Sequence, residues 1–143
     1  MDYAAQFEAL QVKVSETVLA LRAAASESRD QLKERIDQAQ ADADTALEGA
    51  QQRAGEAGDS ARSKWAQMKA DAAAKRDDIK AKFDKQGNQL NYEAAAIDAS
   101  RTAADASDAI DLANWAVENA RLTALDALDS QNYAEELEKK ARQ

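Results

Sequence analysis

The chain has no cysteine, no histidine and no proline among its 143 residues. Without cysteine and histidine, disulfides, Cys-His dyads, Ser-His-Asp triads and zinc sites built from these ligands are excluded. Without proline, and with only four glycines, few positions interrupt a helix. Aromatic residues make up 5% of the chain, so a thick globular core is not expected. These absences predict an all-α protein that is not an enzyme and holds no cofactor.

Phosphate and metal sites are also not expected. Gly55 and Gly58 lack the following Lys-Ser or Lys-Thr of a phosphate-binding loop. Carboxylates on one helix rarely hold Ca²⁺, which takes six or more oxygens, usually from a bent loop. We therefore interpret the one acidic cluster as a solvated or lysine-paired face and predict no metal site. That cluster consists of Asp98, Asp105, Asp108 and Asp111.

Small or apolar residues recur with helical periods in both halves of the chain. From Leu10 to Phe83 the period is 11 residues, and it keeps its phase through Gly55 and Gly58. This predicts one long helix over 29–86 that bends at the glycines without ending. Beyond Asn88 the period is seven, which predicts a second long helix over 89–142 with an alanine seam. The seam runs through Ala96, Ala99, Ala103, Ala106, Ile110, Ala113, Val117, Ala120, Ala124 and Ala127.

A turn signal at Gly87-Asn88 separates the two long helices and predicts an antiparallel hairpin. Residues whose numbers add up to about 175 then lie opposite each other, since both helices rise equally. This register places Phe83 opposite Tyr92 and Trp65 opposite Ala106 and Ile110, so that large side chains face smaller ones. It also places the basic stretch 62–85, with eight bases and four acids, near acidic residues of the second helix. We expect Lys64, Lys69, Lys75, Arg76 and Lys82 to lie near Glu93, Asp98, Asp105 and Asp111.

The apolar N-terminal helix, predicted over 1–27, has no partner in this hairpin. Ser28 and Gln31 have the spacing of a capping box, which predicts a helix start after a break at 26–28. Folding back there gives an elongated three-helix bundle, a single domain over 1–143. The alternative is an uninterrupted helix from residue 3 to 86 whose free apolar face dimerises.

Charge and hydropathy limit the partners. A net charge of −8 argues against nucleic acid, because binding to phosphates depends on Lys and Arg. No stretch approaches the ~18 apolar residues of a transmembrane helix, and the first residues lack a basic segment followed by an apolar one. We expect a soluble, cytoplasmic protein.

The segment Ala50-Gln51-Gln52-Arg53-Ala54-Gly55-Glu56-Ala57-Gly58-Asp59-Ser60-Ala61 resembles the 11-residue repeats of late embryogenesis abundant proteins and related amphipathic-helix proteins. That resemblance implies a chain that becomes helical on drying or on a lipid surface. Trp65 and Trp115 depart from those families and favour a bundle folded in water. The alanine-rich, acidic C-terminal half is similar to small uncharacterised actinobacterial helical proteins, which implies no activity.

Two functions remain open. The first is a non-enzymatic scaffold or adaptor that self-associates, as a homodimer for example, or binds another protein. Its candidate binding residues are Phe7, Leu10, Val14, Val18, Leu21, Trp115 and Leu122. Trp115 and Leu122 have a competing interpretation, burial under the returning N-terminal helix, which we favour for them.

The second function is a surface-active or stress protein, comparable to phasin-like granule coats, whose N-terminal helix contacts lipid or polymer peripherally. The N-terminal helix has few basic residues and is therefore poorly suited to bind anionic membranes.

Overall fold

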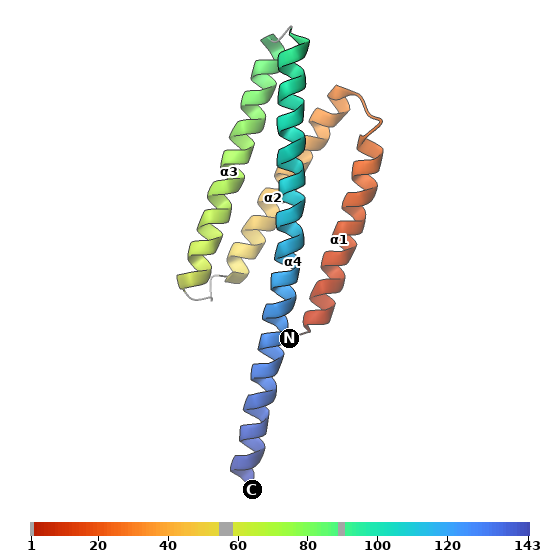
Figure 1. Ribbon diagram of the computed structural model, residues 1–143. Coiled ribbons are helices and arrows are strands. Elements are labelled where there is room, and N and C mark those ends of the chain that lie inside the picture. Colours follow the sequence, from red (N-terminus) through yellow and green to blue (C-terminus); the bar gives the residue numbers. More distant parts are fainter. Residues whose placement is uncertain (1, 55–58, 89–90) are drawn as a thin grey trace. The chain divides into compact units, whose positions relative to one another are not determined.

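The protein is all-α. The computed structural model describes residues 2–54, 59–88 and 91–143, and none of them lies in a strand. They form four helices: α1 (Tyr3–Ala24), α2 (Arg29–Ala54), α3 (Asp59–Asn88) and α4 (Tyr92–Arg142) (Figure 1). The prediction of an all-α fold is thus confirmed, with four helices in place of the expected three. Two units divide these helices: residues 2–89 contain α1, α2 and α3, and residues 90–143 contain α4.

Polar side chains mark the helix boundaries at α1 and α2. Asp2 caps α1, its carboxylate accepting a hydrogen bond from the Ala5 amide at 3.0 Å. At the start of α2 the Ser28 amide donates to the Gln31 side-chain oxygen at 3.0 Å, and the Gln31 amide donates back to the Ser28 hydroxyl at 3.3 Å. This reciprocal pair is the predicted capping box, and it is confirmed. The alternative of an uninterrupted helix over 3–86 is therefore wrong.

The predicted long helix over 29–86 is also wrong. Helix α2 ends at Ala54 and α3 begins at Asp59, and the two run antiparallel within their unit (Figure 1). Gly55 and Gly58, on which the predicted bend rested, lie outside the described residues. Each glycine costs a helix about 1 kcal/mol relative to alanine. A reversal between Ala54 and Asp59 lets α2 and α3 cover each other, which a continuous helix forbids.

Three contacts set the register of α2 against α3. The Arg29 guanidinium donates to the Gln86 side-chain oxygen at 2.7 Å, and Arg76 donates to Asp44 at 2.9 Å. The Lys33 ammonium lies 5.4 Å from the centroid of the Phe83 ring. In each pair the residue numbers add up to between 115 and 120. The half-buried apolar side chains of both helices fall opposite one another at nearly the same register: Leu32, Ile36 and Leu47 of α2, and Trp65, Ile79 and Phe83 of α3.

Two helices are separated near Gly87-Asn88 as predicted, but the turn does not lie at these two residues. These residues are the last two of α3, and α4 begins at Tyr92. The Asn91 side chain caps α4 by accepting a hydrogen bond from the Glu93 amide at 2.9 Å. Residues 89 and 90 lie outside the described part of the chain. The 175 register between α3 and α4 stays a prediction, as does the single domain over 1–143.

Helix α4 is a single helix of 51 residues, Tyr92–Arg142. The predicted helix over 89–142 is therefore found with a slightly later start. Its last turn carries Lys139, Lys140 and Arg142, which complement the negative end of the helix dipole. Arg142 also pairs with Glu138 one turn earlier, at 2.5 Å. These exposed contacts stabilise only the end of the helix. The length of α4 follows from its proline-free, alanine-rich sequence.

Large apolar side chains remain accessible throughout the described part of the chain, where no side chain is fully buried. Fully burying a valine or leucine side chain stabilises a protein by about 1.5–3 kcal/mol. The exposed side chains of this chain do not yet contribute that free energy. None of the described helices is long and apolar enough to cross a membrane.

Candidate interaction surface on α1

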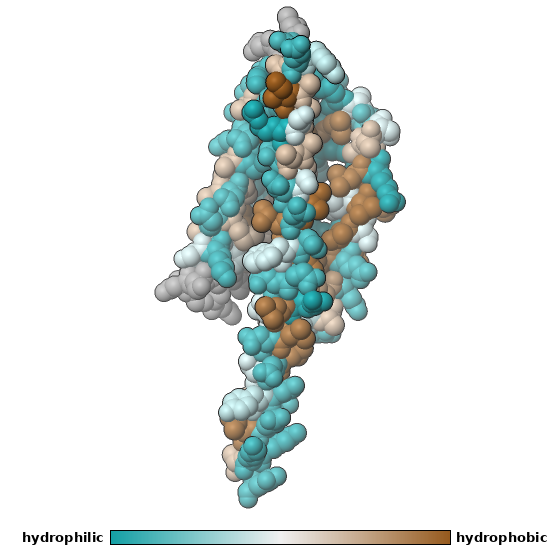
Figure 2. All heavy atoms as spheres, viewed as in Figure 1, coloured by the Kyte–Doolittle hydropathy of each residue, from teal (hydrophilic) through white to brown (hydrophobic). Residues whose placement is uncertain are grey.

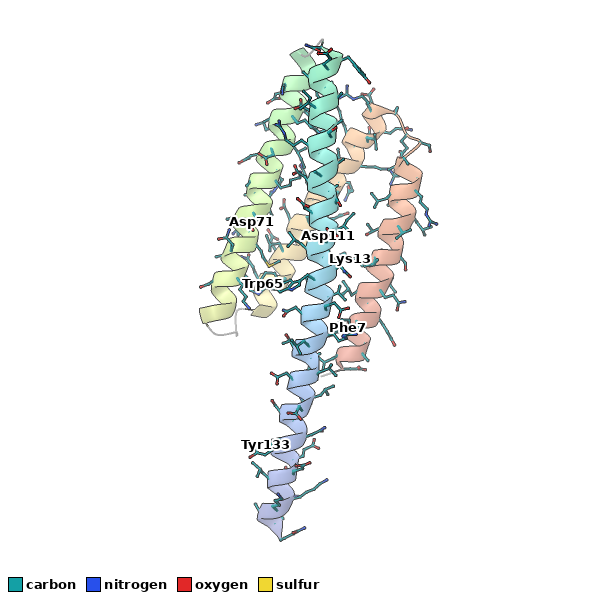
Figure 3. The ribbon with its side chains drawn as sticks, viewed as in Figure 1. Phe7, Lys13, Trp65, Asp71, Asp111 and Tyr133 are labelled. Atoms are coloured by element: carbon teal, nitrogen blue, oxygen red, sulfur yellow. The ribbon has the colours of Figure 1, made fainter. Side chains whose placement is uncertain are left out.

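Helix α1 carries an apolar face made of Phe7, Leu10, Val14, Val18 and Leu21. Their spacings of three and four residues keep these five side chains on one side of a helix. Phe7 is half-buried, and the other four are between 39% exposed, for Leu10, and 62% exposed, for Leu21. Figure 2 shows hydrophobic side chains at the surface along α1, and Figure 3 labels Phe7 on the same helix. The structure thus places these five predicted residues on one accessible helix face, which we call the α1 face.

The sequence of α1 explains why this face stays accessible. The helix ends at Ala24, and the backbone amides of Ser26 and Glu27 bond to the carbonyl oxygens of Ala23 and Ala24 in the turn that follows. The chain then turns into α2, whose half-buried residues lie at the register of α3. The Arg29–Gln86 and Arg76–Asp44 bonds and the Lys33–Phe83 ring contact join α2 to α3, and the apolar side chains of α1 stay partly exposed.

The charged side chains of α1 lie outside the α1 face. The helix holds two acids, Glu8 and Glu16, and two bases, Lys13 and Arg22, so its net charge is zero. Glu8 and Glu16 lie four residues before and after Val12, on the side of the helix opposite the α1 face. Within the described residues none of these four side chains has an ion-pair partner. Figure 3 labels Lys13 on α1.

The remaining predicted residues, Trp115 and Leu122, lie on α4. They are seven residues apart, so they share one side of the helix, and they are 65% and 66% exposed. Their burial under the N-terminal helix would involve both units of the chain and stays a prediction. They form a second apolar pair in a different unit of the chain from the α1 face.

The acidic cluster of α4 is spread along one helix. Asp111 is labelled on this helix in Figure 3. Over the ranges that the structure describes, no three acidic side chains gather closely enough to hold a metal ion. Helical spacing alone spreads Asp98, Asp105, Asp108 and Asp111 along the axis at 1.5 Å per residue.

One expectation for the basic stretch is corrected by the structure. Arg76, expected near an acid of the second long helix, pairs with Asp44 of α2. The Lys82 ammonium lies 5.2 Å from the centroid of the neighbouring Phe83 ring. The reason is the reversal between Ala54 and Asp59, which brings α2 acids alongside α3. The partners expected for the lysines on α4 stay predictions.

Sequence reasoning overlooked the α2–α3 contacts. The signal for the α2–α3 hairpin was present, because two glycines within four residues disfavour a helix interior.

Comparisons with protein-family models, curated proteins and solved structures give no match to this chain.

Proposed function

We propose that the protein is a non-enzymatic helical scaffold or adaptor that acts by binding protein through the α1 face. The observation that carries this proposal is the exposure of Leu10, Val14, Val18 and Leu21 on one side of a helix that is capped at its start. These anchors stand at i, i+4, i+8 and i+11, and an amphipathic helix that presents apolar anchors on one side is a common docking element for a second protein.

The chemistry of the chain favours binding over catalysis. Histidine and cysteine are absent, so general acid-base work would fall to carboxylates, lysines and tyrosines. The described acidic side chains do not form a group that could hold a metal ion. Trp115 and Leu122 offer a second apolar pair on α4, suited to anchor a further partner.

Lipid or polymer is the competing partner for the α1 face. Interfacial helices usually carry several Lys and Arg residues on the polar side, which attract anionic headgroups. Helix α1 has Lys13 and Arg22 balanced by Glu8 and Glu16. This neutral composition favours a protein surface.

A photo-crosslinking amino acid at Val14 tests the proposal in the cells that naturally make the protein. We expect the probe to form a covalent adduct with protein, either another copy or a different chain. The same probe at Gln38, an exposed position of α2, is the control and should give little adduct. Lipid adducts alone at position 14, or equal protein adducts at both positions, would contradict the proposal.

A further inference from the structure

We propose that two copies of the chain exchange α3, so that α2 of each copy packs against α3 of the other in a symmetric dimer. Within a single copy the two helices fold back on each other. In the dimer α2 and α3 of one copy are collinear, and the two copies lie antiparallel. This inference goes beyond the proposed function, because it concerns α2 and α3 and does not involve the α1 face.

The packed faces of α2 and α3 are in phase along the chain. When residues 29–88 are numbered along one helix of 3.6 residues per turn, the six large apolar side chains that are half-buried fall within a sector of about 60°. A hairpin does not need this agreement, because its connection can rotate one helix against the other. Two collinear helices do need it, since both must face one straight partner. These six residues are Leu32, Ile36, Leu47, Trp65, Ile79 and Phe83.

The register of the hairpin also fits an exchanged pair. Arg76 donates to Asp44 at 2.9 Å and Arg29 donates to Gln86 at 2.7 Å, and the residue numbers add up to nearly the same value in both pairs. Two straight helices that pair antiparallel about a two-fold axis require a constant sum, because each pair then recurs with the copies interchanged. Both contacts are therefore available between copies, and each forms twice.

The exchange keeps the contacts of the single copy. Among the described residues no side chain is fully buried, so α2 and α3 are joined through partly exposed contacts that a second copy can replace. Domain swapping of this kind is a low-cost route to a dimer, since the contacts within the fold and between the copies are the same. Association costs entropy, and a higher protein concentration offsets that cost by mass action.

The exchanged dimer would carry one α1 helix at each end. Helix α2 begins at Arg29, directly after the turn that follows α1. In the antiparallel pair the two Arg29 residues lie at opposite ends, roughly 90 Å apart at 1.5 Å per residue. Such a dimer joins two α1 faces in one molecule, which suits a scaffold that binds two partners at once.

The first test crosslinks residues of different copies. The chain has no cysteine, so introduced thiols are the only ones. Full-length chains with Ile36→Cys and with Ile79→Cys are mixed in urea, refolded together at about 100 μM and treated with a short bis-maleimide. Position 36 of one copy then lies opposite position 79 of the other, and we expect a covalent heterodimer of twice the monomer mass of 15.5 kDa.

The control for this crosslink is Ile36→Cys mixed with Val12→Cys, an exposed position of α1. This mixture should give little heterodimer, because the exchange brings no α1 residue opposite position 36. Equal amounts of heterodimer in the two mixtures, or none in either, would refute the exchange.

The second test makes the collinear form easier to reach. Gly55→Ala combined with Gly58→Ala favours helix where the chain passes from α2 to α3, and the dimer gains this effect in both copies. We expect sedimentation equilibrium to show that the dimer Kd falls by roughly 100-fold. Gly87→Ala is the control and should leave the Kd unchanged, because Gly87 already lies in α3 and an added Cβ meets no atom within 4 Å. An unchanged Kd in the double variant, or an equal fall in the control, contradicts the inference.

The outcomes leave the proposed function separately testable. A wild-type chain that stays monomeric at about 100 μM would overturn the exchange. The crosslinking probe at Val14 would still decide whether the α1 face binds protein.

Discussion

At the scale of single residues, hydrogen bonds made by short polar side chains decide where helices begin. Asp2, Ser28 and Asn91 each precede a helix and accept a hydrogen bond from a backbone amide two or three residues later. A helix leaves its first four amides without partners, so one well-placed oxygen changes the preferred starting point. These contacts are local, and sequence spacing therefore predicted the Ser28–Gln31 pair.

Removing the Ser28 hydroxyl should shorten α2 from its start. We expect Ser28→Ala to lower the free energy of unfolding by about 1 kcal/mol, because the Gln31 amide loses its acceptor. Thermal melts followed by circular dichroism measure this loss. Ser26→Ala is the matched control in the same turn, since the Ser26 hydroxyl bonds only to the Ala23 carbonyl oxygen at 3.2 Å. An equal loss in both variants would contradict a specific role of the capping box.

At the scale of elements, α2 and α3 are paired by few but well-distributed contacts. An ion pair joins Arg76 to Asp44, a hydrogen bond joins Arg29 to Gln86, and Lys33 lies over Phe83. Exposed ion pairs contribute about 0–1 kcal/mol each, so they set the register more than they add stability. The half-buried side chains at that register supply the larger part.

Coupling between Ile36 and Ile79 tests the α2–α3 pairing. Their numbers add up to 115, which places them opposite each other, and both are half-buried. We expect a double-mutant cycle of Ile36→Ala and Ile79→Ala to give an interaction energy of about 0.5–1 kcal/mol. Urea unfolding measures each corner of the cycle. Ile36→Ala combined with Val12→Ala, an exposed position of α1, is the control, and a larger coupling there would refute the hairpin.

At the scale of the whole molecule, charge is distributed unevenly over a chain with no fully buried side chain among its described residues. Helix α4 is strongly acidic, α3 carries an excess of bases, and α1 is neutral. Such a molecule repels its copies at long range but offers a neutral apolar helix at short range. The affinity between two copies therefore depends on the distance over which salt screens their electrostatic repulsion.

Salt should strengthen the association of two copies. The screening length falls from about 30 Å at 0.01 M salt to about 8 Å at 0.15 M. Repulsion between two chains of charge −8 is then reduced, whereas contacts between apolar side chains are not screened. We expect a several-fold lower Kd at the higher salt concentration, measured by sedimentation equilibrium. A Kd that rises with salt would indicate that ion pairs, and not apolar contacts, dominate the dimer.

The candidate site could be predicted in part. Spacing identified the five residues of the α1 face, because a single helix determines which of its side chains share a side. Whether those side chains are exposed depends on the rest of the chain, and no local pattern contains that information. The burial of Trp115 under the N-terminal helix stays a prediction for this reason.

The sequence by itself determined the helical class, the break before Ser28 and the boundary after Asn88, since each depends on propensities and caps within a few residues. Only the tertiary structure decided that α2 pairs with α3. The 11-residue pattern keeps its phase across Gly55 and Gly58, so it is compatible both with one long helix and with two that fold back. The chain folds back when the free energy lost by interrupting the helix is smaller than the free energy gained by burying apolar surface between α2 and α3. That surface is buried only once the chain has reversed, so no local pattern records it.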